Sequence, residues 1–158
     1  MRKLAIAISI LPTALTAALM VATPAGATTP SAVSGPETFT GASATVVRTA
    51  GGNTIIANTL TGIIAGSFTG TFTAEFTTIA HSSGLTNDVH GTYICTCSFA
   101  GRSGSVTFRF EGTGSPSGTV LHAETIGATG GLAGLHSNLT VDVAGTAVTY
   151  SGTAHFAP

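Results

Sequence analysis

Residues 66–79, with the sequence GSFTGTFTAEFTTI, decide the fold class of this chain. Phe68, Phe72 and Phe76 occupy one set of alternate positions, whereas threonines and Glu75 occupy most of the other set. Successive side chains of a β-strand point to opposite faces, so this period of two predicts a strand with one buried and one exposed face. We expect the aromatic face to point into the protein and the threonine face to meet solvent or another subunit.

The same alternation recurs along most of the chain, between short turns rich in glycine, serine and asparagine. It predicts strands at residues 44–49, 54–62, 66–79, 89–99, 105–112, 119–126, 135–143 and 147–156, with a short pairing strand around 37–40 before them. Eight strands joined by short turns are typical of an up-and-down meander, and eight is a number at which a sheet closes. The sequence therefore predicts an all-β protein, a single eight-stranded antiparallel up-and-down β-barrel.

The first segment is typical of a cleaved signal peptide rather than of a folded element. Residues 1–3 are Met-Arg-Lys, residues 4–22 are almost wholly apolar, and Ala-Gly-Ala at 25–27 provides small residues for a cleavage site. A membrane anchor is the alternative, but Pro12 interrupts the apolar run and no positive cluster follows it. We therefore expect a secreted, extracellular protein with no membrane association after cleavage.

These observations divide the chain into a signal peptide at 1–27, a flexible leader at 28–43 and a barrel domain at 44–158. Charged residues make up only 7% of the chain, and its one lysine, Lys3, lies in the predicted signal peptide. Proteins that bind nucleic acid or anionic membranes carry basic patches, which this composition does not provide. Both partner classes are therefore excluded from the expected functions.

Two glycine-rich turns resemble those of a known group of proteins. Residues 100–105, AGRSGS, and residues 125–135, TIGATGGLAGL, resemble turns of uncharacterised bacterial secreted barrels. The second turn is similar, in a relaxed form, to one in plant dirigent proteins and allene oxide cyclases. The resemblance covers residues 44–156 and implies an eight-stranded antiparallel barrel. The plant relatives act without cofactors on apolar small molecules in the bore, whereas the bacterial group gives no activity to carry over. The plant relatives are often oligomeric, so a homo-oligomer is left open.

The alternation also predicts which side chains would meet a ligand inside such a barrel. Tyr93 shares a face with other apolar residues of its strand, as do Phe108 and Phe110. We expect a small apolar ligand to contact the inward aromatic residues, namely Phe68, Phe72, Phe76, Tyr93, Phe108, Phe110 and Tyr150.

The only clustered candidates for catalysis are His122 and Glu124, which share one face of a strand. If that face points inward, desolvation would raise the pKa of Glu124, and the pair could act as a general acid and base. If it points outward, the two residues form an ordinary surface pair. Leu121 and Ala123 compete for the interior positions and favour the outward orientation. The histidine and cysteine spacings give no clear metal-binding motif, so we expect no metal and no cofactor.

Cys95 and Cys97 are the only cysteines of the chain. Residues two apart in a strand lie about 6.5–7 Å apart, at the outer limit for a disulfide bond. Two buried thiols are the favoured interpretation. A disulfide at a bulge, an intermolecular bridge and a metal site are the alternatives.

Three functions are compatible with this sequence. The first is binding of a small apolar ligand in the bore, and the second is an inert structural or interaction module with a filled bore. The third is a cofactor-free cyclase or isomerase that acts on an apolar small molecule. A bore with room for a ligand would exclude the filled module, and an inward acid or base would favour the enzyme.

Overall fold

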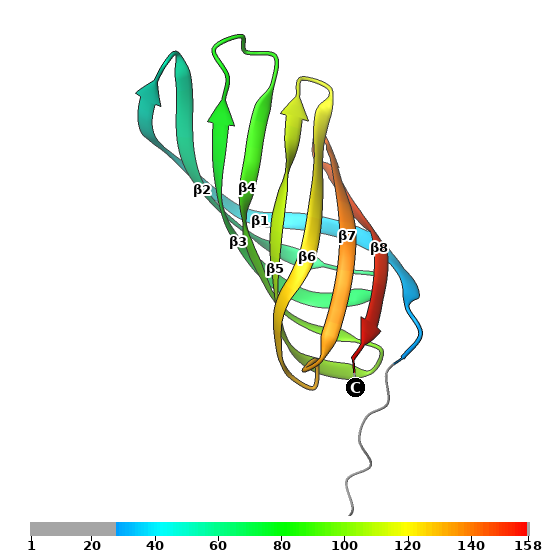
Figure 1. Cartoon of the computed structure of the whole chain (residues 1–158). Helices are drawn as coiled ribbons and strands as arrows, with labels where there is room; N and C mark the ends of the chain where they lie inside the picture. Colours follow the sequence, from blue (N-terminus) through cyan, green and yellow to red (C-terminus); the bar gives the residue numbers. More distant parts are fainter. Residues whose placement is uncertain (1–27, 158) are drawn as a thin grey trace, which may run out of the picture.

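The computed structural model describes residues 28–157 and consists of β-strands joined by short turns (Figure 1). The predicted signal peptide at 1–27 lies outside the described residues. The strands are β1 (Ser31–Ala50), β2 (Asn53–Ile64), β3 (Phe68–Ala80), β4 (Asn87–Phe99), β5 (Arg102–Ser115), β6 (Gly118–Gly130), β7 (Leu135–Ala144) and β8 (Ala147–Phe156). This architecture confirms the predicted all-β class.

The eight strands form one closed barrel in which each strand pairs antiparallel with its neighbours in the sequence. The ring closes between the two ends of the chain, where β1 pairs with β8 from Ser31↔Ala154 to Glu37↔Val148. The predicted up-and-down topology is therefore confirmed.

The structure corrects the predicted boundary of the barrel domain. Residues 31–43, which we assigned to a flexible leader with a short pairing strand around 37–40, form the first thirteen residues of β1. Gly35 and Pro36 weaken the local strand signal. Residues 31–37 pair with β8, more than 100 residues away, and Val33 is buried against the core. The pairing is thus a long-range effect that the local pattern does not show.

One end of the barrel is filled by aromatic side chains. The buried Phe68 ring stacks on Phe99, with centroids 4.8 Å apart, and lies 6.0 Å from the Tyr150 ring. The Tyr150 hydroxyl donates to the carbonyl of Ala65 and accepts from the backbone N–H of Phe68, both at 2.9 Å. Leu132, from the turn between β6 and β7, is fully buried. This end, called the packed end below, has no room for a ligand among these groups.

The opposite end is splayed (Figure 1). Along β1 the pairing with β8 stops at Glu37, and residues 38–50 pair only with β2 and are exposed. Because β1 and β8 are not paired there, this end, called the open end below, leaves the bore incompletely covered.

Cys95 and Cys97 are joined by a disulfide, which corrects the favoured interpretation of two free thiols. Their Cα atoms are 5.5 Å apart, closer than the roughly 6.5–7 Å of a regular strand. The β4 register with β3 and β5 is continuous, so no bulge accommodates the bond. A local shortening of the strand therefore brings both buried side chains within bonding range.

The seam between β1 and β8 depends on the small size of Gly35. A Cβ atom at this position would overlap the carbonyl oxygen of Ala65 and lie 2.7 Å from the Tyr150 hydroxyl. We therefore expect Gly35→Ala to destabilise the protein by about 1–3 kcal/mol. Gly127→Ala is the control, because no atom lies within 4 Å of a Cβ added there. Urea denaturation measures both, and an equal midpoint for the two variants would contradict the role of the seam.

Candidate functional site

A cavity of about 280 Å³ occupies the bore on the open-end side of the packed aromatic residues. Most of its wall is apolar and comes from all eight strands. Apart from Glu37 and Asn87, the lining residues are Phe39, Leu60, Ile64, Phe72, Ala74, Phe76, Thr78, Val89, Tyr93, Phe108, Phe110, Thr119, Leu121, Ala123, Leu139, Val141, Val143 and Val148. Such a volume lies just below the range of about 300–1,000 Å³ that is usual for drug-sized ligands.

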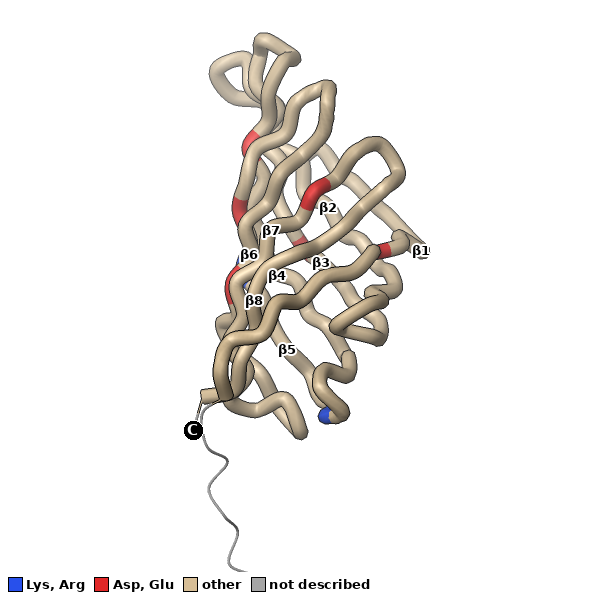
Figure 2. The backbone as a smooth tube through the Cα atoms, turned by 90° about the vertical axis from the view of Figure 1, so that its right-hand side faces the viewer, with Lys and Arg blue, Asp and Glu red and all other residues tan. Residues whose placement is uncertain are grey.

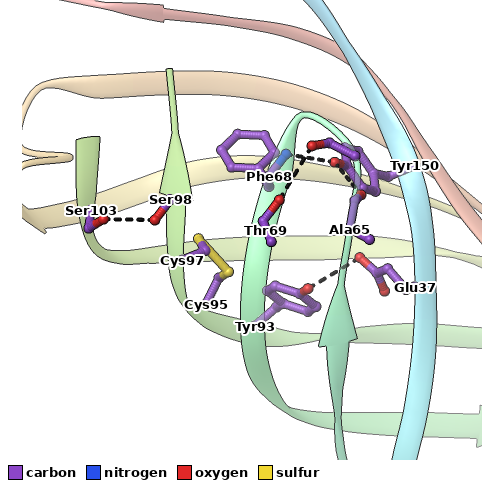
Figure 3. Close-up of a disulfide and its surroundings, with 11 residues drawn as sticks. Glu37, Ala65, Phe68, Thr69, Tyr93, Cys95, Cys97, Ser98, Ser103 and Tyr150 are labelled. Atoms are coloured by element: carbon purple, nitrogen blue, oxygen red, sulfur yellow. Dashed lines mark hydrogen bonds between the residues drawn. A yellow bond between two sulfur atoms is a disulfide. The ribbon is translucent and has the colours of Figure 1, made fainter. Parts of the chain in front are cut away.

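The inner end of the cavity carries a carboxyl group paired with a phenol (Figure 3). Glu37 points inward from β1, and the Tyr93 hydroxyl on β4 donates a hydrogen bond of 3.2 Å to its Oε1 atom. The Tyr93 ring is held by a stacked Phe72 ring, with centroids 4.5 Å apart, and by the edge of Phe108. Aromatic packing therefore fixes the phenol that orients the carboxyl.

Burial dominates the proton affinity of this pair. It raises the pKa of Glu37 from the usual 4.5 to about 7, although the hydrogen bond from Tyr93 lowers it. Burial and the adjacent Glu37 charge both raise the pKa of Tyr93, so the phenol keeps its proton. A carboxyl with a pKa near neutrality can both donate and accept a proton at neutral pH, which is the property required of a general acid or base.

A second polar group lies on the cavity wall nearer the open end. Asn87 begins β4, and its Oδ1 atom is buried without a hydrogen-bond partner in the described part of the chain. Its amide packs over Gly114, where an added Cβ would lie 2.5 Å from Oδ1. An unpaired buried acceptor reduces stability.

The structure places the predicted ligand-binding residues in two groups. Five of the seven predicted residues line the cavity, namely Phe72, Phe76, Tyr93, Phe108 and Phe110. Phe68 and Tyr150 also point inward, but they lie in the packed end beyond the cavity. Their role is to close the inner end of the bore.

His122 and Glu124 lie on the outer face of β6, as the neighbouring Leu121 and Ala123 favoured. Glu124 forms an exposed ion pair with Arg109 of β5, and His122 lies opposite Glu111. The structure therefore corrects the inward alternative, because neither side chain reaches the bore.

The sequence analysis missed Glu37 as a candidate site residue. The alternation of side chains along β1 indicates that Glu37 points inward. Val33, Gly35 and Glu37 share one face of the strand, and Val33 is buried. That signal is short and becomes informative only once the segment is known to pair with β8.

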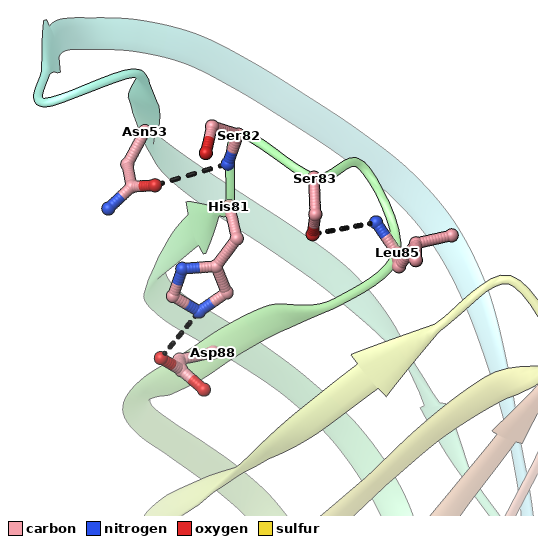
Figure 4. Close-up of polar contacts among 6 residues, drawn as sticks. All are labelled: Asn53, His81, Ser82, Ser83, Leu85 and Asp88. Carbon is pink, nitrogen blue, oxygen red and sulfur yellow. Dashed lines mark hydrogen bonds and ion pairs between the residues drawn. The ribbon is translucent and has the colours of Figure 1, made fainter.

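Polar groups at the loop between β3 and β4 stabilise the open end (Figure 4). The His81 Nε2 atom lies 2.9 Å from Asp88 Oδ2, and Asn53 Oδ1 accepts a hydrogen bond from the backbone N–H of Ser82. The second contact ties this loop to the β1–β2 turn. Elsewhere, charged residues are few and scattered along the backbone (Figure 2).

Residues 28–157 contain neither a cluster of metal-binding side chains nor a membrane-spanning helix. This part of the chain has no group of three or more histidine, cysteine, aspartate or glutamate side chains that could hold a metal ion. It also has no helix long and apolar enough to cross a membrane.

Comparison with known proteins supports the fold. No family model matches the sequence, and no curated protein matches it. Among solved structures, a DUF3224 family protein of unknown function from Shewanella oneidensis MR-1 superimposes with a TM-score of 0.68 at 17% identity, covering 82% of this chain and 99% of that one. At this identity the similarity establishes a shared β fold, and it does not bear on the resemblance to allene oxide cyclases and dirigent proteins.

The raised pKa of Glu37 predicts that stability falls as pH rises. The unfolded chain loses the Glu37 proton near pH 4.5 and the folded protein loses it near pH 7. The stability present below about pH 4.5 is therefore lost progressively up to about pH 7, by at most about 3 kcal/mol. Glu37→Gln should abolish this loss, and the exposed Glu75→Gln should retain it. Urea denaturation at pH 5 and pH 8 measures the effect, and an unchanged pH dependence in Glu37→Gln would contradict it.

Proposed function

We propose that this barrel binds a small, mainly apolar molecule in its bore. The observation that carries the proposal is the cavity of about 280 Å³ between the packed aromatic end and the open end. Its wall contains six of the ten phenylalanine and tyrosine side chains of the chain, together with aliphatic residues. The cavity also reaches strand ends, where a ligand could enter.

The cavity is an argument against the inert module. Protein interiors are normally packed with few voids larger than a water molecule. Residues such as Ala74 and Ala123 face the bore, where larger apolar side chains would fill it. The bore therefore has unfilled volume that a purely structural barrel would not need.

The Glu37–Tyr93 pair supports a second candidate function, a cofactor-free isomerase or cyclase. Proton abstraction next to a carbonyl group requires a base that is held against the substrate and has a pKa near the working pH. Glu37 meets both conditions, because it lines the cavity and its pKa is about 7. The candidate thus rests on a different residue from the His122 and Glu124 pair.

We also propose that the protein works outside the cytoplasm. The disulfide between Cys95 and Cys97 supports this, because such bonds persist mainly in oxidising compartments. The apolar run and small residues at 4–27 are compatible with export.

Filling part of the bore should weaken ligand binding. Ala123→Leu places a larger side chain in the cavity wall, so we expect it to weaken binding of the neutral apolar dye N-phenyl-1-naphthylamine by about tenfold or more. Ala57→Leu is the control, because Ala57 is exposed and lies opposite Thr45 and Thr77 on the outer face. Dye fluorescence reports binding to each protein. Equal affinity in both variants, or no binding to the wild type, would overturn the proposed function.

The isomerase candidate has a separate test. If Glu37 abstracts protons next to a carbonyl, 2-decanone incubated with the protein in D₂O should gain deuterium faster than in buffer alone. Glu37→Gln should lose this exchange while Glu75→Gln keeps it, as measured by mass spectrometry. Exchange at the buffer rate in the wild type, with binding of the ketone demonstrated, would leave binding as the function.

A further inference from the structure

We infer that the bore selects an uncharged molecule with an oxygen acceptor at one end, such as a ketone or aldehyde, and rejects the carboxylate of equal chain length. This inference rests on the proposed ligand-binding function and specifies the chemical class of the ligand. It follows from the placement of Glu37 and from the distribution of positive charge around the bore.

At the inner end of the cavity, one of the two carboxyl oxygens of Glu37 accepts a hydrogen bond from Tyr93. Within the described residues, the side-chain hydrogen bond recorded for Glu37 is the one from Tyr93 to Oε1. The other carboxyl oxygen, Oε2, is therefore available to a molecule in the cavity. Because the Tyr93 hydroxyl already donates its hydrogen bond to Glu37, the carboxyl is the group that meets the polar end of a ligand.

The cavity offers no counter-ion for an anionic ligand. The cavity wall contains no lysine, arginine or histidine. The three arginines of residues 28–157 lie elsewhere: Arg109 pairs with Glu124 on the outer face, Arg102 lies 4.1 Å from the centre of the Phe156 ring, and Arg48 is exposed beyond the β1–β8 seam. A buried carboxylate would thus lack a partner and would lie against another acid, which is strongly unfavourable.

Glu37 could pair with either a hydrogen-bond acceptor or a cationic group on the ligand. A protonated Glu37 donates through its hydroxyl, so a carbonyl oxygen on the ligand would complete its hydrogen bonding. An ammonium group would instead require ionised Glu37, and both charges would have to leave water for an apolar bore. The desolvation cost of such a pair often exceeds its attraction. The neutral acceptor is therefore the favoured partner.

Two tyrosines are the other titratable groups near Glu37. Tyr93 from β4 and Tyr150 from β8 are the titratable side chains that interact with Glu37, and burial raises the pKa of both. The inward partners of Glu37 on the flanking strands, Ile64 of β2 and Val148 of β8, are apolar. A change in ligand affinity between pH 5.5 and pH 8.5 would therefore report the proton of Glu37.

The experiment compares three ten-carbon probes, 2-decanone, decanoate and decylamine, as competitors of N-phenyl-1-naphthylamine in the whole protein. We expect decanoate at pH 8.5 to bind at least about tenfold more weakly than 2-decanone. We expect 2-decanone itself to weaken roughly two- to tenfold from pH 5.5 to pH 8.5, because its hydrogen-bond donor is lost.

Variants separate the role of Glu37 from general packing. Glu37→Gln keeps an N–H donor of similar shape but cannot ionise, so its affinity for 2-decanone should be independent of pH. Glu75→Gln, on the outer face, should behave as the wild type. Native-state folding of each variant is checked by near-UV circular dichroism.

The outcomes distinguish this inference from the proposed function. If the dye binds but decanoate competes as well as 2-decanone, or decylamine competes best, the bore binds ligands and the inference is overturned. A pH dependence that persists in Glu37→Gln would also overturn it. If the dye does not bind at all, the proposed function fails and the inference fails with it.

Discussion

The pairing of β1 with β8 is the interaction on which the rest of the structure depends. It joins residues near the two ends of the described chain, from Ser31↔Ala154 to Glu37↔Val148, and converts a meander with two free edges into a ring. Because side chains alternate along β1, the same pairing that buries Val33 also turns Glu37 into the bore. Ring closure therefore both encloses the cavity and places the Glu37 carboxyl in its wall.

The point at which this pairing stops divides the barrel into two halves. On the closed side of Glu37, large aromatic side chains fill the interior, and the Tyr150 hydroxyl satisfies two backbone groups. On the other side β1 continues with β2 alone, and the wall carries smaller residues such as Ala74 and Ala123. The cavity thus lies where the pairing between β1 and β8 ends.

The sequence predicted most of the fold because alternation is a local signal. Strands β2 to β8 lie within a few residues of the predicted ranges, with aromatic residues such as Phe72 and Phe108 on the inner face. A short strand around 37–40 was predicted, but residues 31–36 of β1 were missed because Gly35 and Pro36 weaken the local pattern and the partner strand is distant in sequence. Glu37 was missed for the same reason, since its orientation depends on a long-range pairing. The disulfide was unexpected because it needs a locally shortened strand, which residue spacing does not reveal.

Three features that reduce stability lie together around the bore. In residues 28–157, the one buried side-chain nitrogen or oxygen without a hydrogen-bond partner is Asn87 Oδ1, and it lines the same cavity as Glu37. Unfilled volume, a carboxyl buried at a cost in stability and an unpaired amide oxygen each reduce stability. If they arose from loose packing alone, they would be expected at scattered positions. Their coincidence in one bore, beside a packed end where buried polar groups such as Tyr150 are satisfied, is typical of a site shaped for a ligand.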